Sequence, residues 1–163
     1  MFSPQTVYTS GPAGYVTSGQ PIDVTVLAAA STGNAVGDIV AMPTPSFNIQ
    51  TGEAYWLPTA QVTVPATADF AINSRKIFGV VLQAAAAGVA TKVRLRGVVN
   101  GSVPASTAAG NVLQATNGTH ALSVTAAGVA ANNLAIAIAL EATTPAAVKA
   151  VLFDGVCGFG SRG

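Results

Sequence analysis

The residues of this 163-residue chain that could carry out chemistry are few and widely spaced. Gly158-Phe-Gly-Ser-Arg-Gly163 has the spacing of a dinucleotide-binding glycine loop. That loop needs a following helix whose N-terminus holds the pyrophosphate, and the chain stops at Gly163. We therefore expect these residues to form a flexible or docking tail rather than a nucleotide site.

Acid–base, nucleophilic and metal chemistry also lack their usual residue sets. The one histidine, His120, follows a predicted hairpin tip, so we expect it in solvent rather than in a catalytic triad. One histidine and one cysteine are too few for zinc, and the acidic residues do not cluster as calcium ligands do. The six carboxylates lie far apart in sequence: Asp23, Asp38, Glu53, Asp69, Glu141 and Asp154. The sequence predicts no enzyme, no cofactor and no metal site.

Composition points to a protein that works through its surface. Only 8% of residues are charged, against about 25% in ordinary soluble domains, and 50% are hydrophobic. Such a surface is either covered by small polar residues or buried against other chains, and we expect both. A net charge of +1 gives no long-range attraction to nucleic acid or to an anionic membrane. We expect neither as a partner.

Targeting and redox signals are equally sparse. The densest apolar run, residues 134–140, is far shorter than the roughly 20 residues of a membrane-spanning helix. The first residues lack the basic start and apolar stretch of a secretory signal. The single cysteine, Cys157, has apolar and glycine neighbours, which predicts a small packed side chain in a protein made in a reducing cytosol.

The elements that must position any site are short strands arranged as an internal repeat. Residues 78–99 align without gaps on residues 136–157 at an offset of 58, and residues 35–40 resemble residues 108–113 at an offset of 73. The first copy therefore holds about fifteen extra residues between its matching blocks. We predict one β domain over residues 22–163, built from two unequal repeats at about 33–101 and 107–160.

Local patterns support an all-β, antiparallel β-barrel or β-sandwich with at most a short helix. Residues 22–27 and 92–96 alternate between apolar and polar, as half-buried strands do. Residues 134–140 place their leucines and isoleucines on one side and alanines on the other. Asn-Gly pairs at 100–101 and 117–118 favour two-residue hairpin turns.

Aromatic residues mark two candidate interface segments. Residues 1–21 are rich in proline and glycine and carry Tyr8 and Tyr15. They are either a poorly ordered terminus or an extended arm that adds a strand to a neighbouring subunit. Tyr55 and Trp56 fall in the extra segment of the first repeat. That segment is either a hairpin that folds over one end of the core or an exposed contact loop.

The two repeats differ most in charge along one strand. Lys92, Arg94 and Arg96 share one strand face, while Val93 and Leu95 face inward. The second repeat has Ala150, Leu152 and Asp154 at the three positions that match the cations. The basic face is either solvated or docks on an acidic partner, including Asp154 of a neighbouring copy.

The strand pattern resembles a known family. Val36-Gly-Asp-Ile-Val40, Ile77-Phe-Gly-Val-Val-Leu82, an alanine-rich turn ending at Gly88, and residues 91–99 resemble the capsid decoration (cement) proteins of tailed phages. More specifically, they are similar to a family of small, β-tulip-like barrels. The resemblance covers residues 33–100 well and residues 107–160 less well.

The resemblance implies a virion protein made in the host cytoplasm. It would bind the outside of an icosahedral shell, contact the major capsid protein and bridge neighbouring capsomers. Such proteins often form homotrimers, although the doubled, unequal unit leaves the symmetry open. The alternative is a phage head-fibre, tail or glycan-binding surface protein, which would display aromatic residues such as Trp56, Tyr55 and Tyr15 in a groove.

Overall fold

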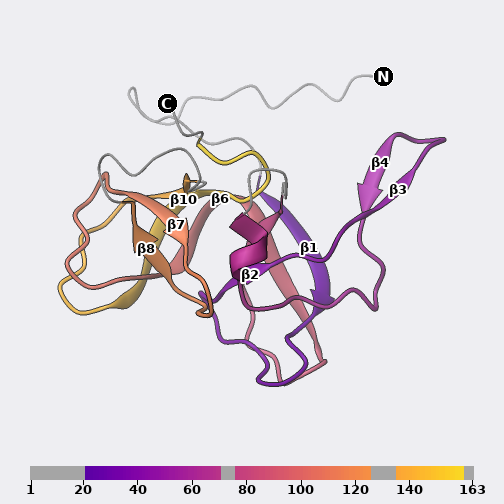
Figure 1. Ribbon diagram of the computed structural model, residues 1–163, viewed down its shortest axis with the longest axis horizontal. Helices are drawn as coiled ribbons and strands as arrows, with labels where there is room; N and C mark the ends of the chain where they lie inside the picture. The colour runs from indigo at the N-terminus through magenta and orange to yellow at the C-terminus, as the bar shows by residue number, and fades with distance from the viewer. Residues whose placement is uncertain (1–20, 71–75, 126–134, 160–163) are drawn as a thin grey trace.

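The structure is a computed structural model that describes residues 21–70, 76–125 and 135–159 (Figure 1). The described residues form strands and one short 3₁₀ helix, in the order β1 (Ile22–Leu27), β2 (Ile39–Ala41), β3 (Ser46–Asn48), β4 (Glu53–Tyr55), η1 (Thr67–Phe70), β5 (Phe78–Val81), β6 (Ala90–Val103), β7 (Val112–Ala115), β8 (Leu122–Val124), β9 (Ala135–Ala139) and β10 (Ala147–Asp154). The prediction of an all-β fold with at most a short helix is confirmed.

Eight of these strands form a single antiparallel sheet that is nearly closed into a barrel. Along the sheet the order is β2-β5-β6-β10-β9-β7-β8, and β1 pairs with β6. The two ends of the sheet meet at His120, just before β8. The amide of Ile39 donates to the His120 carbonyl at 2.8 Å, and the His120 Nδ1 lies 2.9 Å from the Ile39 carbonyl oxygen.

His120 therefore differs from the expectation of a solvent-exposed residue. Its side chain is half-buried, because its backbone and its ring both hydrogen-bond to the edge of β2. In the tautomer with a proton on Nδ1, the ring donates to the Ile39 carbonyl. His120 is thus part of the seam that joins the two ends of the barrel.

The repeat of the sequence is a repeat of strand pairing. In the first repeat Val80 of β5 lies opposite Arg94 of β6. In the second, Ile138 of β9 lies opposite Leu152 of β10, which are the same two positions at the offset of 58. Because both residues of each pair shift by the same offset, the hairpins β5–β6 and β9–β10 have the same register.

The third strand of each repeat follows the same rule. Val40 of β2 pairs with Gly79, and Leu113 of β7 pairs with Ala137. The loops before these strands match as well: the amide of Gly37 donates to Val81 at 2.9 Å, and that of Gly110 donates to Ala139 at 2.7 Å. Two three-stranded units, β2–β5–β6 and β7–β9–β10, therefore share one backbone plan.

Two clusters of buried side chains form the core of the described residues, and they lie on opposite faces of β2 and β5. On β2, Ile39 and Ala41 belong to the first cluster, whereas Val40 belongs to the second. On β5, Phe78 and Val80 face the first cluster and Val81 faces the second. Strands buried on both faces are apolar throughout rather than alternating, which accounts for the continuous hydrophobic runs in this part of the sequence.

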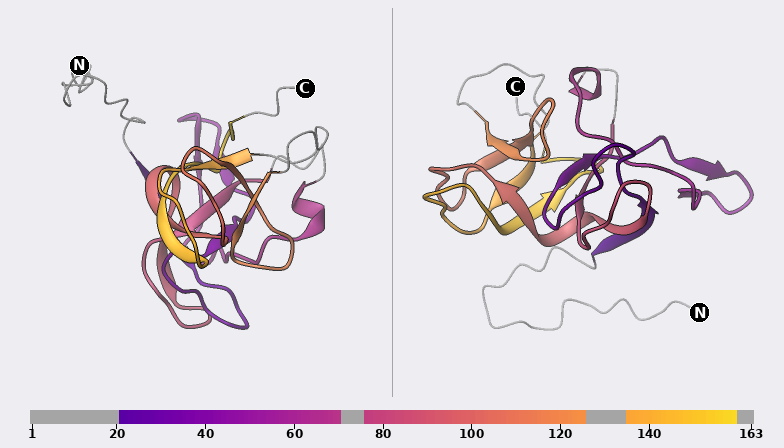
Figure 2. Two further views of the ribbon diagram at one scale, coloured as in Figure 1. Left: turned by 90° about the vertical axis from the view of Figure 1, so that its left-hand side faces the viewer. Right: turned by 90° about the horizontal axis from the view of Figure 1, so that it is seen from below.

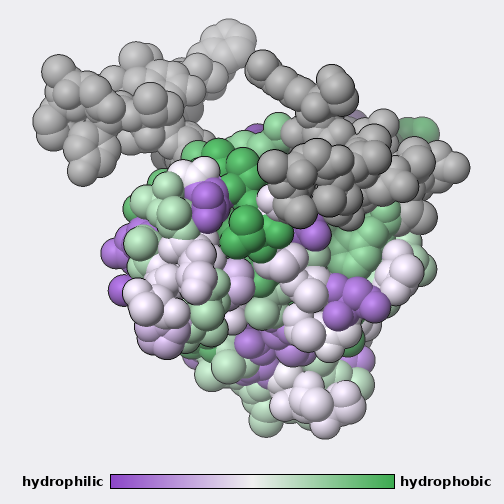
Figure 3. Space-filling view, turned by 60° about the vertical axis from the view of Figure 1, so that its left-hand side comes forward, coloured by the Kyte–Doolittle hydropathy of each residue, from purple (hydrophilic) through white to green (hydrophobic). Residues whose placement is uncertain are grey.

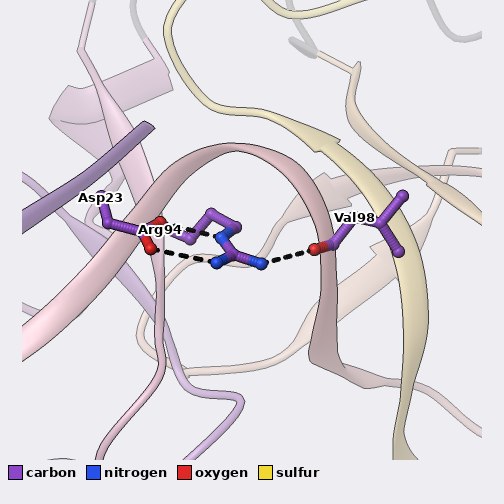
Figure 4. Close-up of polar contacts among 3 residues, drawn as sticks. All are labelled: Asp23, Arg94 and Val98. Atoms are coloured by element: carbon purple, nitrogen blue, oxygen red, sulfur yellow. Dashed lines mark hydrogen bonds and ion pairs between the residues drawn. The ribbon is translucent and has the colours of Figure 1, made fainter. Parts of the chain in front are cut away.

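The long strand β6 shows the alternation that its sequence predicts. Val93 and Leu95 are buried in the second cluster, while Lys92 is exposed and Arg94 and Arg96 are half-buried. Opposite β1 the register shifts between Ile22 and Asp23, which leaves Leu95 as the extra residue of a bulge on β6. The bulge coincides with the arch of this strand (Figure 4).

β9 does not show the predicted arrangement of one apolar and one alanine face. Ile136 lies in the first cluster together with Ala137 and Ala139, whereas Ile138 is half-buried on the outside. The register of β7 with β9 shifts between Leu113 and Gln114, so Ile136 is the extra residue of a bulge. A bulge turns the side chains on either side of it to opposite faces.

The two Asn-Gly pairs have different environments. Asn117 and Gly118 lie in the turn between β7 and β8, in a connection longer than two residues. The pair at 100–101 is not a turn, because it lies inside β6 and pairs with Ala150 and Lys149 of β10. A local turn signal was overridden there by a long partner strand.

The extra residues of the first repeat form a hairpin that projects from the barrel. Strands β3 and β4 pair only with each other, and they lie at the opposite end of the molecule from β7 and β8 (Figures 1 and 2). The chain that follows β4 returns to the barrel and contributes Trp56, Ala60 and Val62 to the second cluster.

In the described parts of the chain, no helix has the length and apolar character needed to cross a membrane.

Candidate interaction surface

Arg94 connects β1 to both limbs of the arch in β6. Its Nε donates to Asp23 Oδ1 at 2.8 Å, and its Nη2 donates to Asp23 Oδ2 at 3.0 Å. Its Nη1 donates to the Val98 carbonyl oxygen at 2.8 Å (Figure 4). This two-pronged contact with a carboxylate is the geometry for which a guanidinium group is suited. Arg94 therefore has partners within its own chain.

The Arg94–Asp23 contact perturbs both ionisable groups. The hydrogen bond from Arg94 holds the pKa of Asp23 below its ordinary value of 3.8, against a smaller opposing effect of burial. The same bond raises the pKa of Arg94. Lys92 adds a weaker electrostatic contribution to Asp23. The charges of Arg94 and Asp23 therefore link β6 to β1.

Arg96 and Asp154 are also brought together. Arg96 Nη2 donates to Asp154 Oδ2 at 2.9 Å, and this bond raises the pKa of Arg96. The two residues are equivalent positions of the two repeats, and they meet because β6 and β10 pair in antiparallel register. The other carboxylate oxygen accepts from the amides of Val156 and Cys157. This pairing within one chain accounts for both charges without a neighbouring copy.

Lys92 is the member of the basic face without such a partner. The ion pairs among the described residues are Lys76–Asp69, Arg94–Asp23 and Arg96–Asp154. Lys92 is exposed and lies opposite Thr25 of β1. The basic face of three cations that the sequence suggests is thus reduced to one unpaired side chain in the described residues.

Tyr55 and Trp56 lie next to each other at the base of the hairpin but have different environments. The indole Nε1 of Trp56 donates to the Pro43 carbonyl at 2.8 Å, and its ring packs against the second cluster. Tyr55 is exposed and pairs with Ser46. Trp56 thus packs on the core, while the hairpin itself is exposed. The use of this hairpin as a contact stays a prediction.

The hairpin also exposes two large apolar side chains that are not among the residues predicted from the sequence. Phe47 is 65% exposed, and Ile49 at the tip is 80% exposed. The tip is a well-formed turn, in which the Asn48 side chain accepts from the Gln50 amide at 3.0 Å and Gly52 has a φ of 70°. The alternation of Phe47 and Ile49 before a Thr-Gly turn was the sequence signal for this element.

A second apolar surface runs across four strands of the barrel. We call it the outer row. It consists of four side chains in register on β6, β10, β9 and β7, namely Val98, Leu152, Ile138 and Val112. Val98 is 49% exposed and Val112 is 40% exposed, and the other two are half-buried. The side of the barrel that bears β7, β8 and β10 shows strongly apolar surface beside polar side chains (Figure 3).

The outer row exists because the first repeat buries both faces of β2 and β5, whereas the second repeat buries only one face of β7 and β9. Ile39 and Val80 of the first repeat lie in the first cluster, against the second repeat. Their equivalents in the second repeat, Val112 and Ile138, face outward. The face of the first repeat that bears Val40 is instead covered by the extra segment of that repeat and by β1.

The remaining predicted residues carry less information about this surface. Tyr8 and Tyr15 lie outside the described residues, and so does most of the glycine-rich tail. Cys157 is exposed rather than packed, because its amide and that of Val156 turn toward the Asp154 side chain after β10 has ended. In the described ranges, no three His, Cys, Asp or Glu side chains lie together as a metal-binding group.

No protein-family model matches this chain, and no curated protein matches its sequence.

Proposed function

We propose that this protein is a capsid decoration protein, which binds the outside of an icosahedral phage shell and bridges neighbouring capsomers. The observation that carries the proposal is the projecting β3–β4 hairpin, which exposes Phe47 on β3 and Ile49 at its tip. Side chains of this size, held away from the barrel, have no core of their own to enter. Their burial in a partner gives about 25 cal/mol for each Å² of apolar surface removed from water.

The charge distribution supports binding through apolar contacts. Arg94 and Arg96 bind carboxylates of their own chain, so they hold the barrel together. The hairpin has Glu53 as its one charged residue in β3 and β4. Apolar anchors surrounded by polar residues are typical of the centre of a protein–protein interface.

The resemblance of residues 33–100 to decoration proteins supplies the partner, the major capsid protein. A protein that binds the assembled lattice but not its dissociated subunits stabilises the lattice by mass action. Many copies, each attached to adjacent subunits, add to this effect. We further propose that the protein acts as a homo-oligomer, with a trimer favoured, on the exterior of the virion.

A glycan-binding or fibre function is less well supported. Stacking on a sugar requires an accessible aromatic face, and Trp56 uses its indole N–H on Pro43 and packs against the core. Tyr55 and Phe47 of the hairpin are exposed, but Phe47 pairs with Ala54 and Tyr55 with Ser46, so the two rings lie on opposite faces of the hairpin and do not form one stacking platform.

The test uses empty, expanded shells assembled from the major capsid protein of the genome that encodes this chain. The native protein should bind in stoichiometric, ordered positions between capsomers, visible by electron cryomicroscopy, and raise the temperature at which the shells break. The double variant Phe47→Ser, Ile49→Ser should lose this binding while its circular dichroism spectrum is unchanged.

Val89→Ser is the matched control, because Val89 is 52% exposed but lies in the turn before β6 rather than in the hairpin. It should bind the shells like the native protein. Failure of the native protein to bind any such shell would overturn the proposal. Equal binding by the native protein and the hairpin variant would remove the hairpin from it.

A further inference from the structure

The outer row begins where the described chain begins. Pro21 lies against Gly97, with its Cβ and Cα 3.2 and 3.3 Å from the position that a Gly97 Cβ would occupy. Gly97 has a φ of 123°, a conformation open to glycine, and it has no side chain to keep Pro21 away from β6. The next residue is Val98, the first member of the outer row. Residues 1–20 therefore join the fold beside one end of this row.

The face that covers the equivalent side of the first repeat is already used inside the fold, so a second copy cannot offer it to the row. In the first repeat, the face equivalent to the outer row is covered by the Leu113 and Val151 face of the second repeat. The first repeat has its own version of that covering face, the one that bears Val40, and it is buried under Val62 and Trp56. A second copy could not stack on the row in the same way, because neither of these covering faces is free.

The composition and length of residues 1–20 suit such a surface. The segment contains no Asp, Glu, Lys or Arg, and its large apolar and aromatic residues include Phe2, Tyr8 and Tyr15. Twenty extended residues reach up to about 66 Å at about 3.3 Å each. Four strands spaced about 4.8 Å apart are crossed in about 14 Å. The segment is thus long enough to cross the row with residues to spare.

We propose that residues 1–20 lie across the outer row of their own chain and cover Val98, Leu152 and Ile138. Covering these side chains removes apolar area from water, which offsets the conformational entropy lost by the segment. The segment takes the place that the second repeat takes over the equivalent face of the first. This inference does not depend on the capsid-binding function, which we assign to the β3–β4 hairpin.

The test is photo-crosslinking in the full chain, without capsids. p-Benzoylphenylalanine is placed at Tyr15 and, separately, at Tyr8, and the crosslinked peptides are identified by mass spectrometry. We expect crosslinks to peptides that contain Val98, Ile138 or Leu152. Mixing isotope-labelled and unlabelled chains distinguishes contacts within one chain from contacts between chains.

Val98→Ser removes part of the apolar area that residues 1–20 would cover. The equilibrium constant for covering the row should therefore fall about fivefold, and the crosslink yield should fall with it. Leu152→Ser, opposite Val98 on β10 and also among the covered side chains, provides a second variant if Val98→Ser disturbs β6. Val89→Ser, with a similar exposed fraction, should leave the yield unchanged. Crosslinks only between chains, only to the β3–β4 hairpin, or not at all to the row would overturn the proposal.

Discussion

The two repeats share one plan of strand pairing but differ in how many faces they bury: β2 and β5 are buried on both faces, whereas β7 and β9 are buried on one. β2–β5–β6 and β7–β9–β10 pair in the same register up to the bulge at Ile136, and the turns at Gly37 and Gly110 share a φ near 90°. Yet Ile39 is fully buried, whereas its equivalent Val112 is 40% exposed. The backbone plan therefore does not determine which face is covered; the neighbours of each unit do.

The outward-facing residues of β6 and β10 also differ between the two repeats. The first repeat has Arg94 where the second has Leu152, and Lys92 where the second has Ala150. The charged side is largely satisfied inside the chain by Asp23, whereas the apolar side has no cover among the described residues. We infer that the second repeat, rather than the basic strand, offers the surface for a further contact.

The largest expected effect on the free energy of unfolding comes from truncating Ile39, compared with truncating Val112, its equivalent in the second repeat. Ile39→Ala should lower the free energy of unfolding by about 3 kcal/mol, because it leaves a cavity in the first cluster. Val112→Ala should cost less than about 1 kcal/mol, because part of this side chain is already in water. Urea unfolding of both variants measures the difference. Equal losses would show that the outer row is as well covered as the core.

The sequence predicts the repeat better than it predicts the faces. An ungapped match across two strands and their connection preserves the register, so the pairing of Val80 with Arg94 implies that of Ile138 with Leu152. It does not say which side of each unit meets the other. Ile39 and Val40 are both apolar, and only the tertiary arrangement assigns them to different clusters.

Other features could not be predicted because they depend on distant partners. The bulge at Ile136 comes from pairing between β7 and β9, and it reverses the face on which Ile138 lies. Asn100 and Gly101 form part of a strand because β10 pairs across them. Arg96 meets Asp154 because the last strands of the two repeats are neighbours, a fact that aligning the repeats does not contain.

The candidate surface was predicted in part. The extra segment around Trp56 was recognised as an elaboration of the first repeat, and it does contain the projecting hairpin. Residue type alone points to Trp56, which packs inward, rather than to Ile49, which is exposed at the tip. A two-stranded hairpin has no buried face to impose a pattern, so its exposed residues leave a weak signal in the sequence.

A medium effect compares the two glycines that precede the third strand of each repeat. Gly37 and Gly110 have φ values of 90° and 87°, so alanine brings backbone strain of about 1 kcal/mol at either site. At Gly110 an added Cβ meets nothing within 4 Å. At Gly37 it would lie 2.8 Å from a Val148 methyl, so Gly37→Ala should cost about 2 kcal/mol by thermal unfolding.

The control for this pair removes the obstacle. In a Val148→Ala background, Gly37→Ala should cost about as much as Gly110→Ala, because only the shared backbone strain of about 1 kcal/mol remains. If the two glycine variants already cost the same in the native background, the neighbours of the two loops do not differ as the structure indicates.

The smallest expected effect concerns the charge that the first repeat has and the second lacks. Arg94→Ala should lower the free energy of unfolding by about 1 kcal/mol, at the upper end for an exposed ion pair, because the guanidinium also bonds the Val98 carbonyl. Lys92→Ala on the same strand face should change it little. A double-mutant cycle with Asp23→Ala isolates the pair from the loss of the carbonyl contact.

The pH dependence of the free energy of unfolding tests whether the Arg94–Asp23 ion pair stabilises the fold. Because Arg94 lowers the pKa of Asp23 in the folded state, the unfolded chain binds its proton first as the pH falls below 3.8. The contribution of Asp23 is therefore complete above this value and is lost as the pH falls through the lower pKa of the folded state. Asp23→Asn removes that loss, so the stability difference between native protein and variant should shrink on acidification. If the free energies of unfolding of the native protein and of Asp23→Asn instead run parallel from neutral pH down to about pH 2, Asp23 is not held by Arg94 in solution. The charged side of β6 would then be no better satisfied than the outer row.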